Sequence, residues 1–380
     1  MRTALWAIIL KELRQTFRDK RTAALLIVAP VIQLIVLGFA VNLEVDHVPT
    51  AIVDLDRTPE SRRFADGLVA GETFEMKGNV DTGEEAIELI DHGKVCIAVV
   101  LPAGFERSLG EGLPTQVQLL VDGGDSNRAI IAQNAATAYT TQVGFRLAMD
   151  RAQQQAAALG VFVKRPALLQ VQARILYNPT LNSHIYFVPG VGGTLLLVVT
   201  VIVTSMGLAR EKEAGTMEQI MVTPMSPMVV ILGKTLPYAL IAFVDLGLVV
   251  AGGALIFKVP IRGQLWLIGL AGILYILTTL GIGLLISTVA KSQQQSFMLA
   301  FFFMMPAILL SGFMTPIANM PHWLQLVTHF NPVRHLIEVL RAVLLKAATF
   351  SDVAPQLVAL GGLGITVFLL AVMAMQRQLK

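Results

Sequence analysis

Uncharged stretches long enough to cross a membrane recur along the chain. The first runs from Thr22 to Leu43, which is 22 residues between Arg21 and Glu44, and about 20 helical residues span a hydrocarbon core of about 30 Å. The later stretches that we expect to cross the membrane are residues 185–209, 235–257, 263–290, a part near 297–317, and 353–376. The pattern predicts six transmembrane helices.

The first stretch has a second interpretation. Basic residues precede it, and Gly38-Phe39-Ala40 loosely resembles the cleavage site of a secretory signal peptide. The apolar region of a signal peptide has about 7 to 15 residues, which is shorter than this stretch. We therefore expect a retained span at residues 22–43, preceded over residues 1–21 by an amphipathic elbow helix on the cytoplasmic side.

Residues 44–184 have a different composition, with 18 acidic and 12 basic side chains. Short apolar runs separated by turn and helix signals predict an α/β domain with a small mixed sheet. The predicted strands are Thr50 to Leu55, Val95 to Leu101 and Gln116 to Val121; the predicted helices are Thr58 to Val69, Thr82 to Ile90 and Ala129 to Ala158. An alternating run over residues 171–177 is expected to lead back to the membrane.

Basic residues in the short connections set the orientation, because cytoplasmic loops carry an excess of Lys and Arg. With the N-terminus inside, the cytoplasmic pieces hold 12 Lys and Arg and the short outer pieces hold 5. We therefore expect both termini in the cytoplasm and residues 44–184 outside it. The fold class that follows is an α-helical polytopic membrane protein of six transmembrane helices, with an α/β extracytoplasmic domain inserted between helices 1 and 2.

The overall composition agrees with a membrane protein. Hydrophobic residues make up 54% of the 380 and charged residues 14%, against roughly 25% charged in soluble domains. These values exclude a disordered or nucleic-acid-coating protein. Cys96 is the single cysteine, so no disulfide forms within the chain, and the scattered histidines predict no metal site.

The loop at residues 210–227, after the second span, is predicted to face the cytoplasm and to contain a short helix. Thr216 and Gln219 have the spacing of a capping box, and Pro224 ends the helix. Exposed apolar side chains beside a charge cluster are typical of a docking surface, and a helix folded onto the bilayer surface is the alternative. The candidate docking residues are Arg210, Glu211, Glu213, Gly215, Thr216, Met217, Glu218, Ile220 and Pro224.

Residues 318–350 are expected to form re-entrant or interfacial helices on the outer side. Asn331 and Pro332 make an N-cap and first-turn pair, and the helix after them is amphipathic, with Arg334, Glu338 and Arg341 on its polar face. Such a helix lies on the membrane surface or packs over the mouth of a pathway. A seventh span is the weaker alternative because it would place three charges in the membrane.

Two polar residues fall inside predicted spans. Asp245 lies near the middle of the third span, where a carboxylate is costly unless it is paired or hydrated. It is a candidate for the transport pathway or for a hydrogen bond between helices. Gln33 in the first span is a weaker candidate of the same kind. Lys234 lies 11 residues from Asp245, too far to pair within one helix, and is expected to reach the cytoplasmic surface.

Two separated motifs resemble those of the type-2 ABC exporter permeases. The first is REKEAGTMEQ from Arg210 to Gln219, continued by VTPMSP up to Pro227. The second combines LSGFMTP from Leu310, MPHWL from Met320, and NPVRH from Asn331, followed by Leu340 and Arg341. The similarity spans nearly the whole chain, and the large domain between spans one and two resembles the multidrug-export branch.

The resemblance implies a permease subunit in a bacterial inner membrane that exports amphiphilic drugs or lipid-like molecules by alternating access. It implies two ABC ATPase subunits as partners, a second permease subunit in a homodimer or heterodimer, and room for a periplasmic adaptor. Residues 210–224 would be the coupling helix seated in the ATPase, and residues between spans five and six would cap the pathway.

The chain itself is not expected to be an enzyme. Gly233-Lys234-Thr235 resembles the end of a phosphate-binding loop, but Met228 stands where that loop needs glycine. We therefore expect no cofactor in this chain and ATP with Mg in the partner ATPase. A membrane-anchored sensor or envelope assembly factor that binds through the outer domain is the alternative function.

Overall fold

Two compact units make up the chain. The computed structural model describes residues 2–18, 20–40, 47–71, 73–158, 177–178, 182–215 and 227–378. One unit, here called the helical unit, combines Met1–Asn42 with Arg174–Lys380, and the other, the α/β unit, is Leu43–Ala173.

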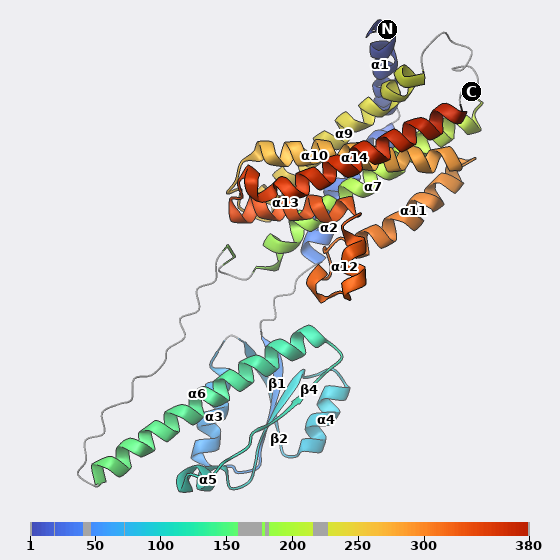
Figure 1. The fold of residues 1–380 in the computed structure, drawn as a ribbon. Coiled ribbons are helices and arrows are strands. Elements are labelled where there is room, and N and C mark those ends of the chain that lie inside the picture. The colour runs from blue at the N-terminus through green and yellow to red at the C-terminus, as the bar shows by residue number, and fades with distance from the viewer. Residues whose placement is uncertain are drawn as a thin grey trace. The chain divides into compact units, whose positions relative to one another are not determined.

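The helical unit is a bundle of long apolar helices with shorter ones at its ends (Figure 1). Four of its described helices are long and apolar enough to cross a membrane: Ser183–Glu213, Met228–Leu255, Leu265–Val289 and Phe350–Arg377. The elements of this unit are α1 (Arg2–Arg18), α2 (Lys20–Ala40), α7 (Ser183–Glu213), α9 (Pro227–Leu255), α10 (Leu265–Val289), α11 (Gln293–Leu309), η1 (Ile317–Asn319), α12 (His322–Thr328), α13 (Pro332–Lys346) and α14 (Phe350–Gln378).

One expected span is shorter in the structure. Helix α2, at the first expected span, is 21 residues long, from Lys20 to Ala40. The predicted span near residues 297–317 is instead the 17-residue helix α11, which begins at Gln293 and ends at Leu309. A turn follows, in which Gly312 has a φ of 76°, a left-handed conformation that glycine adopts without strain. The count of six spans therefore stays a prediction.

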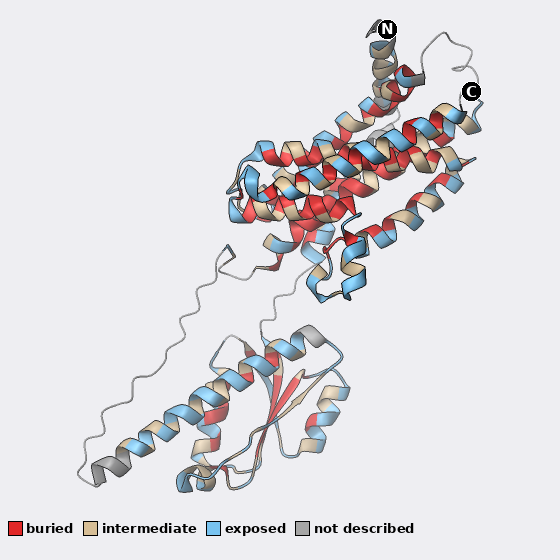
Figure 2. Ribbon diagram, in the orientation of Figure 1, coloured by how far each residue is buried: buried red, intermediate tan, exposed pale blue. Residues whose placement is uncertain are grey.

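Helix α7 is the centre of the helical unit. It packs against α2, α9, α10, α11 and α13, and Figure 2 shows buried residues concentrated along it. Small residues allow this close packing: a Cβ on Gly192 would lie 2.3 Å from Val249 of α9. The hydroxyl of Tyr275 in α10 donates a hydrogen bond of 3.0 Å to the carbonyl of Gly193.

Helix α13 is more deeply packed than a surface helix. Its N-cap is Asn331, whose side chain accepts a hydrogen bond from the Val333 backbone, as the sequence predicts. Its apolar face, including Leu336 and Leu340, is buried against α7, α10 and α14. Three neighbouring helices cover that face, and the position of residues 318–350 as outer interfacial or re-entrant helices stays a prediction.

The α/β unit contains one four-stranded mixed sheet in the order β2-β1-β3-β4. Strands β1 (Val48–Asp54), β2 (Phe74–Val80) and β3 (Ile97–Leu101) are parallel, and β4 (Gln118–Val121) is antiparallel to β3. Its helices are α3 (Pro59–Val69), α4 (Gly83–Asp91), α5 (Phe105–Glu111) and α6 (Ser126–Ala158). Strand β2 and helix α5 were not among the predicted elements, and the expected run at 171–177 lies almost wholly outside the described residues.

The side chain of Asp56 accepts several hydrogen bonds at the edge of the sheet where β1 and β3 end. Asp56 follows β1 and accepts hydrogen bonds from the backbone N–H groups of Gly104 (2.7 Å) and Glu106 (2.9 Å). It also accepts one from the Thr58 hydroxyl at 2.7 Å. These hydrogen bonds join the loop after β1 to the start of α5, at the edge where parallel sheets commonly bind ligands.

Candidate substrate cavity and its charged end

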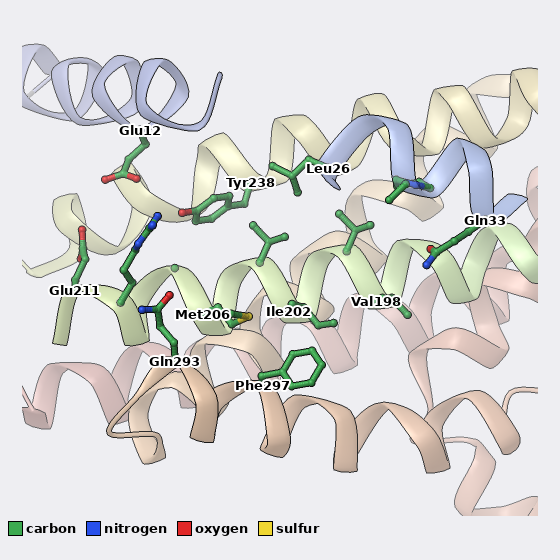
Figure 3. A pocket seen from close by; sticks show the side chains of 16 residues that line it. Glu12, Leu26, Gln33, Val198, Ile202, Met206, Glu211, Tyr238, Gln293 and Phe297 are labelled. Carbon is green, nitrogen blue, oxygen red and sulfur yellow. The ribbon is translucent and has the colours of Figure 1, made fainter. Parts of the chain in front are cut away.

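A cavity of about 710 Å³ lies within the helical unit. Its walls come from α2, α7, α9 and α11, and α1 lies at one end (Figure 3). A volume of this size is typical of a site for a drug-sized molecule. The lining residues are Glu12, Leu26, Ala29, Pro30, Gln33, Val198, Val199, Ile202, Val203, Met206, Gly207, Arg210, Glu211, Tyr238, Gln293 and Phe297.

Apolar side chains form most of the wall. Ile202 and Met206 of α7 lie along one side, and Phe297 of α11 lies beyond them (Figure 3). Gln33 of α2, a candidate from the sequence, lies in the wall at the end away from Glu12 and Glu211. Such a cavity matches an elongated amphiphile better than a polar solute, because its polar groups are confined to its ends.

Charged side chains from three helices gather at the other end. Glu211, near the end of α7, forms an ion pair with Lys234 of α9, and both side chains are largely buried, with 17% and 5% exposed. Glu12 of α1 is 7% exposed and lies at the same end. The expectation that Lys234 reaches the surface is wrong, because its partner is a carboxylate on a neighbouring helix.

Lys212 and Glu213, which follow Glu211 in α7, contact two further helices. The Lys212 ammonium donates hydrogen bonds to the carbonyls of Ser287 (2.5 Å) and Thr288 (3.2 Å), at the end of α10. The Glu213 carboxylate accepts hydrogen bonds from the backbone N–H (3.2 Å) and the side-chain amide (2.9 Å) of Gln293, at the start of α11. The end of α7 therefore contacts α9, α10 and α11 through consecutive side chains.

Only part of the predicted coupling segment is described. Arg210 is exposed and lines the cavity, and Gly215 has a φ of 69° just after α7 ends. A left-handed glycine at this place is a common way to end a helix. Thr216, Met217, Glu218, Ile220 and Pro224 lie outside the described residues, so their coupling role stays a prediction.

Asp245 lies apart from the cavity. It is 2% exposed, is not one of the lining residues, and neither carboxylate oxygen has a hydrogen-bond partner among the described residues. The expected hydrogen bond between helices is therefore not formed by those residues.

The outer group of candidates forms two separate clusters. Arg334 pairs with Glu338 (2.9 Å), and Gln356 of α14 donates a hydrogen bond to the same carboxylate (3.2 Å). Arg341 instead stacks on the ring of Tyr186 at 3.7 Å and donates a hydrogen bond to its hydroxyl at 2.9 Å. Burial lowers the pKa of the Arg341 guanidinium below its ordinary value.

Sequence reasoning missed Glu12, Lys212 and Lys234 as members of one site. The partners of Lys212 and Lys234 lie on other helices, more than 70 positions away along the chain for Lys212. The sequence did contain one signal for this site. Lys234 and Glu12 are charged residues inside or beside apolar helices, and a buried charge needs a partner.

Comparison with known proteins found a matching family and several similar permeases. The family profile described as "ABC-2 family transporter protein" matches residues 20–373. The chain is 35% identical over 349 residues, 92% of each chain, to the probable multidrug ABC transporter permease YbhR of Escherichia coli K12. It is 29% identical to the probable multidrug ABC transporter permease YbhS of the same organism, covering 89% of this chain and 88% of YbhS. It is also 25% identical to the inner membrane transport permease YhhJ, covering 95% of this chain and 94% of YhhJ. The chain therefore belongs to the ABC-2 family of transporter proteins.

Proposed function

We propose that this chain is the permease subunit of an ABC exporter that moves amphiphilic molecules, such as drugs or lipid-like compounds, out of a bacterial cell by alternating access. The observation that carries the substrate class is the 710 Å³ cavity with a largely apolar wall and charged groups at one end. An amphiphile would place its apolar body along Ile202 and Phe297 and its polar group near Glu12 and Arg210.

Energy would come from a separate ABC ATPase that binds ATP and Mg. Residues 210–227 would seat in that subunit, since they continue from the charged end of the cavity. A second permease subunit, identical or related, would complete the pathway, and a periplasmic adaptor would be a further partner.

The proposed location is the bacterial inner membrane, with both termini cytoplasmic and residues 44–184 outside. The excess of basic residues in the connections on one side supports this orientation. Similarity to named permeases over nearly the whole chain does not favour a sensor or assembly factor.

Filling the cavity tests the substrate site. Ile202→Trp adds an indole to the wall, so we expect efflux of cationic amphiphilic dyes from a pump-deficient host to fall about tenfold while basal ATP hydrolysis by the purified complex persists. Ile273→Trp is the matched control, because Ile273 is 55% exposed on α10 and does not line the cavity. Undiminished efflux by Ile202→Trp at normal expression would contradict the cavity as substrate site.

Replacing Gly215-Thr216-Met217 by charged residues tests the coupling role. The expected result is a complex in the membrane that hydrolyses ATP without exporting dye. Arg377→Glu, at the exposed end of α14, changes charge without touching the segment and should export normally. A segment variant with normal efflux per ATP hydrolysed would count against this route of coupling.

A further inference from the structure

Three consecutive charged residues at the end of α7, here called the junction, each contact a different helix. Glu211 binds α9 through Lys234, Lys212 binds the end of α10, and Glu213 binds the start of α11. Glu211 and Lys212 are half-buried and Glu213 is exposed, and each of the three has a separate structural partner.

Lys212 and Glu213 match the electrostatics of the helix ends that they contact. The ammonium of Lys212 meets carbonyls at the C-terminus of α10, where the helix dipole favours a cation. The carboxylate of Glu213 meets N–H groups at the N-terminus of α11, where the dipole favours an anion. One turn of α7 therefore fixes both sides of the short connection between α10 and α11.

The Glu211–Lys234 pair joins the end of α7 to the start of α9, the two helices that flank residues 214–226 in the sequence. Glu211 lies in the last turn of α7, and Lys234 lies two turns after α9 begins at Pro227. Both side chains are largely buried, and removing one partner of a buried pair leaves an uncompensated charge. A displacement at the end of α7 would therefore act on α9 as well.

We propose that Glu211, Lys212 and Glu213 are positioning residues that transmit a displacement of residues 214–226 to α9, α10 and α11 together, each through its own contact. This inference rests on the proposed coupling role of that segment. It adds that transmission is divided by helix: Lys234 links α9, Lys212 links α10 and Glu213 links α11.

The experiment places one nitroxide spin label on each helix. The reporters are Leu240→Cys on α9, Ile273→Cys on α10 and Phe302→Cys on α11, which are 56%, 55% and 77% exposed, each in a chain with Cys96→Ser. The full permease–ATPase complex in lipid nanodiscs is compared without nucleotide and trapped with ATP and vanadate, and the change in EPR line shape is measured.

With an intact junction, all three reporters should respond to nucleotide. Glu213→Ala should reduce the response at Phe302→Cys about fivefold or more while sparing Leu240→Cys, and Lys212→Met should act in the same way on Ile273→Cys. Lys234→Met should reduce the response at Leu240→Cys. The conservative variants Glu213→Gln, Lys212→Arg and Lys234→Arg keep the hydrogen bonds or the charge and should restore each response. Arg107→Met, which breaks an exposed ion pair in the α/β unit, should change none of them.

Two results would overturn the inference alone: responses that survive every junction variant, or responses lost at all three reporters together with a lower thermal midpoint, which indicates a general loss of packing. Reporters that ignore nucleotide in the intact complex would also overturn it. The variant with charged residues at Gly215-Thr216-Met217 is run in parallel. Responses that persist in that variant would reject the proposed coupling role, and the inference with it.

Discussion

Asp56 shows at the scale of one residue how a carboxylate stabilises the α/β unit. Slight burial raises its pKa, but the hydrogen bonds from the Glu106 backbone, the Thr58 side chain and the Gly104 backbone lower it by more, so the pKa lies below its ordinary value. Asn in its place supplies an amide nitrogen where one carboxylate oxygen now accepts. We expect Asp56→Asn to reduce the free energy of unfolding of this unit by about 1–2 kcal/mol.

Cys96 provides the measurement, because it is the single thiol of the chain and lies in the α/β unit. The urea concentration at which it becomes fully reactive to a maleimide reports unfolding of this unit. Because the folded-state pKa of Asp56 is depressed, its contribution is present at neutral pH and is lost as the pH falls below about 4. The difference between wild type and Asp56→Asn should therefore shrink in acid.

Asp81→Asn is the matched control for this measurement. Its carboxylate pairs with Arg57, and the two side chains are 78% and 68% exposed, so the expected change is below about 0.5 kcal/mol. Equal effects of the two variants would show that the hydrogen bonds of Asp56 do not stabilise the unit.

At the scale of elements, the contact between α10 and α14 depends on glycine. A Cβ on Gly281 would lie 3.0 Å from the backbone nitrogen and 3.1 Å from the Cα of Phe368. Backbone cannot move aside as a flexible side chain can, so Gly281→Ala should push the two helices apart. We expect the thermal midpoint of the detergent-solubilised protein, followed by tryptophan fluorescence of the helical unit, to fall.

Gly362→Ala is the control in α14, because a Cβ there would meet nothing within 4 Å. Alanine is a better helix former than glycine, so this variant should keep or raise the thermal midpoint. If Gly281→Ala behaved like Gly362→Ala, close packing of α10 on α14 would not be a source of stability.

Sequence patterns predicted the strands and helices in which burial of one or both faces sets the spacing of apolar residues. Strands β1 and β3 are buried along most of their length and were expected within about two residues of their ends. Strand β2 was missed because it is an edge strand whose side chains, such as Glu75 and Lys77, are largely outside the core. Helix α5 was missed because it has only seven residues and begins after Gly104, whose φ is 79°.

The candidate site was predictable only in part, for a different physical reason. The motif at residues 210–213 marked the end of α7 because charges follow an apolar span. The partners of these charges, Lys234 and Gln293, are set by which helices pack together, and one sequence contains no direct signal for that packing. Asp245 stood out for its charge, yet it lies away from the cavity.

At the scale of the whole molecule, the orientation in the membrane can be tested with the same cysteine-free background. In a chain with Cys96→Ser, Lys94→Cys is exposed on the α/β unit and Gly215→Cys is exposed after α7. A membrane-impermeant maleimide applied to intact spheroplasts should label Lys94→Cys and spare Gly215→Cys, and inverted vesicles should give the opposite result. Labelling of both positions from the same side would reject the proposed topology.

The central place of α7 has a consequence for biosynthesis. The helices that cover it include α10, α11 and α13, and all three are translated after it. Until residues up to Lys346 have left the ribosome, the part of α7 that α13 covers, at Gly193, must remain against lipid or against an insertion factor. Nascent chains arrested before that point should therefore be the ones most readily captured by membrane chaperones and degraded by membrane proteases.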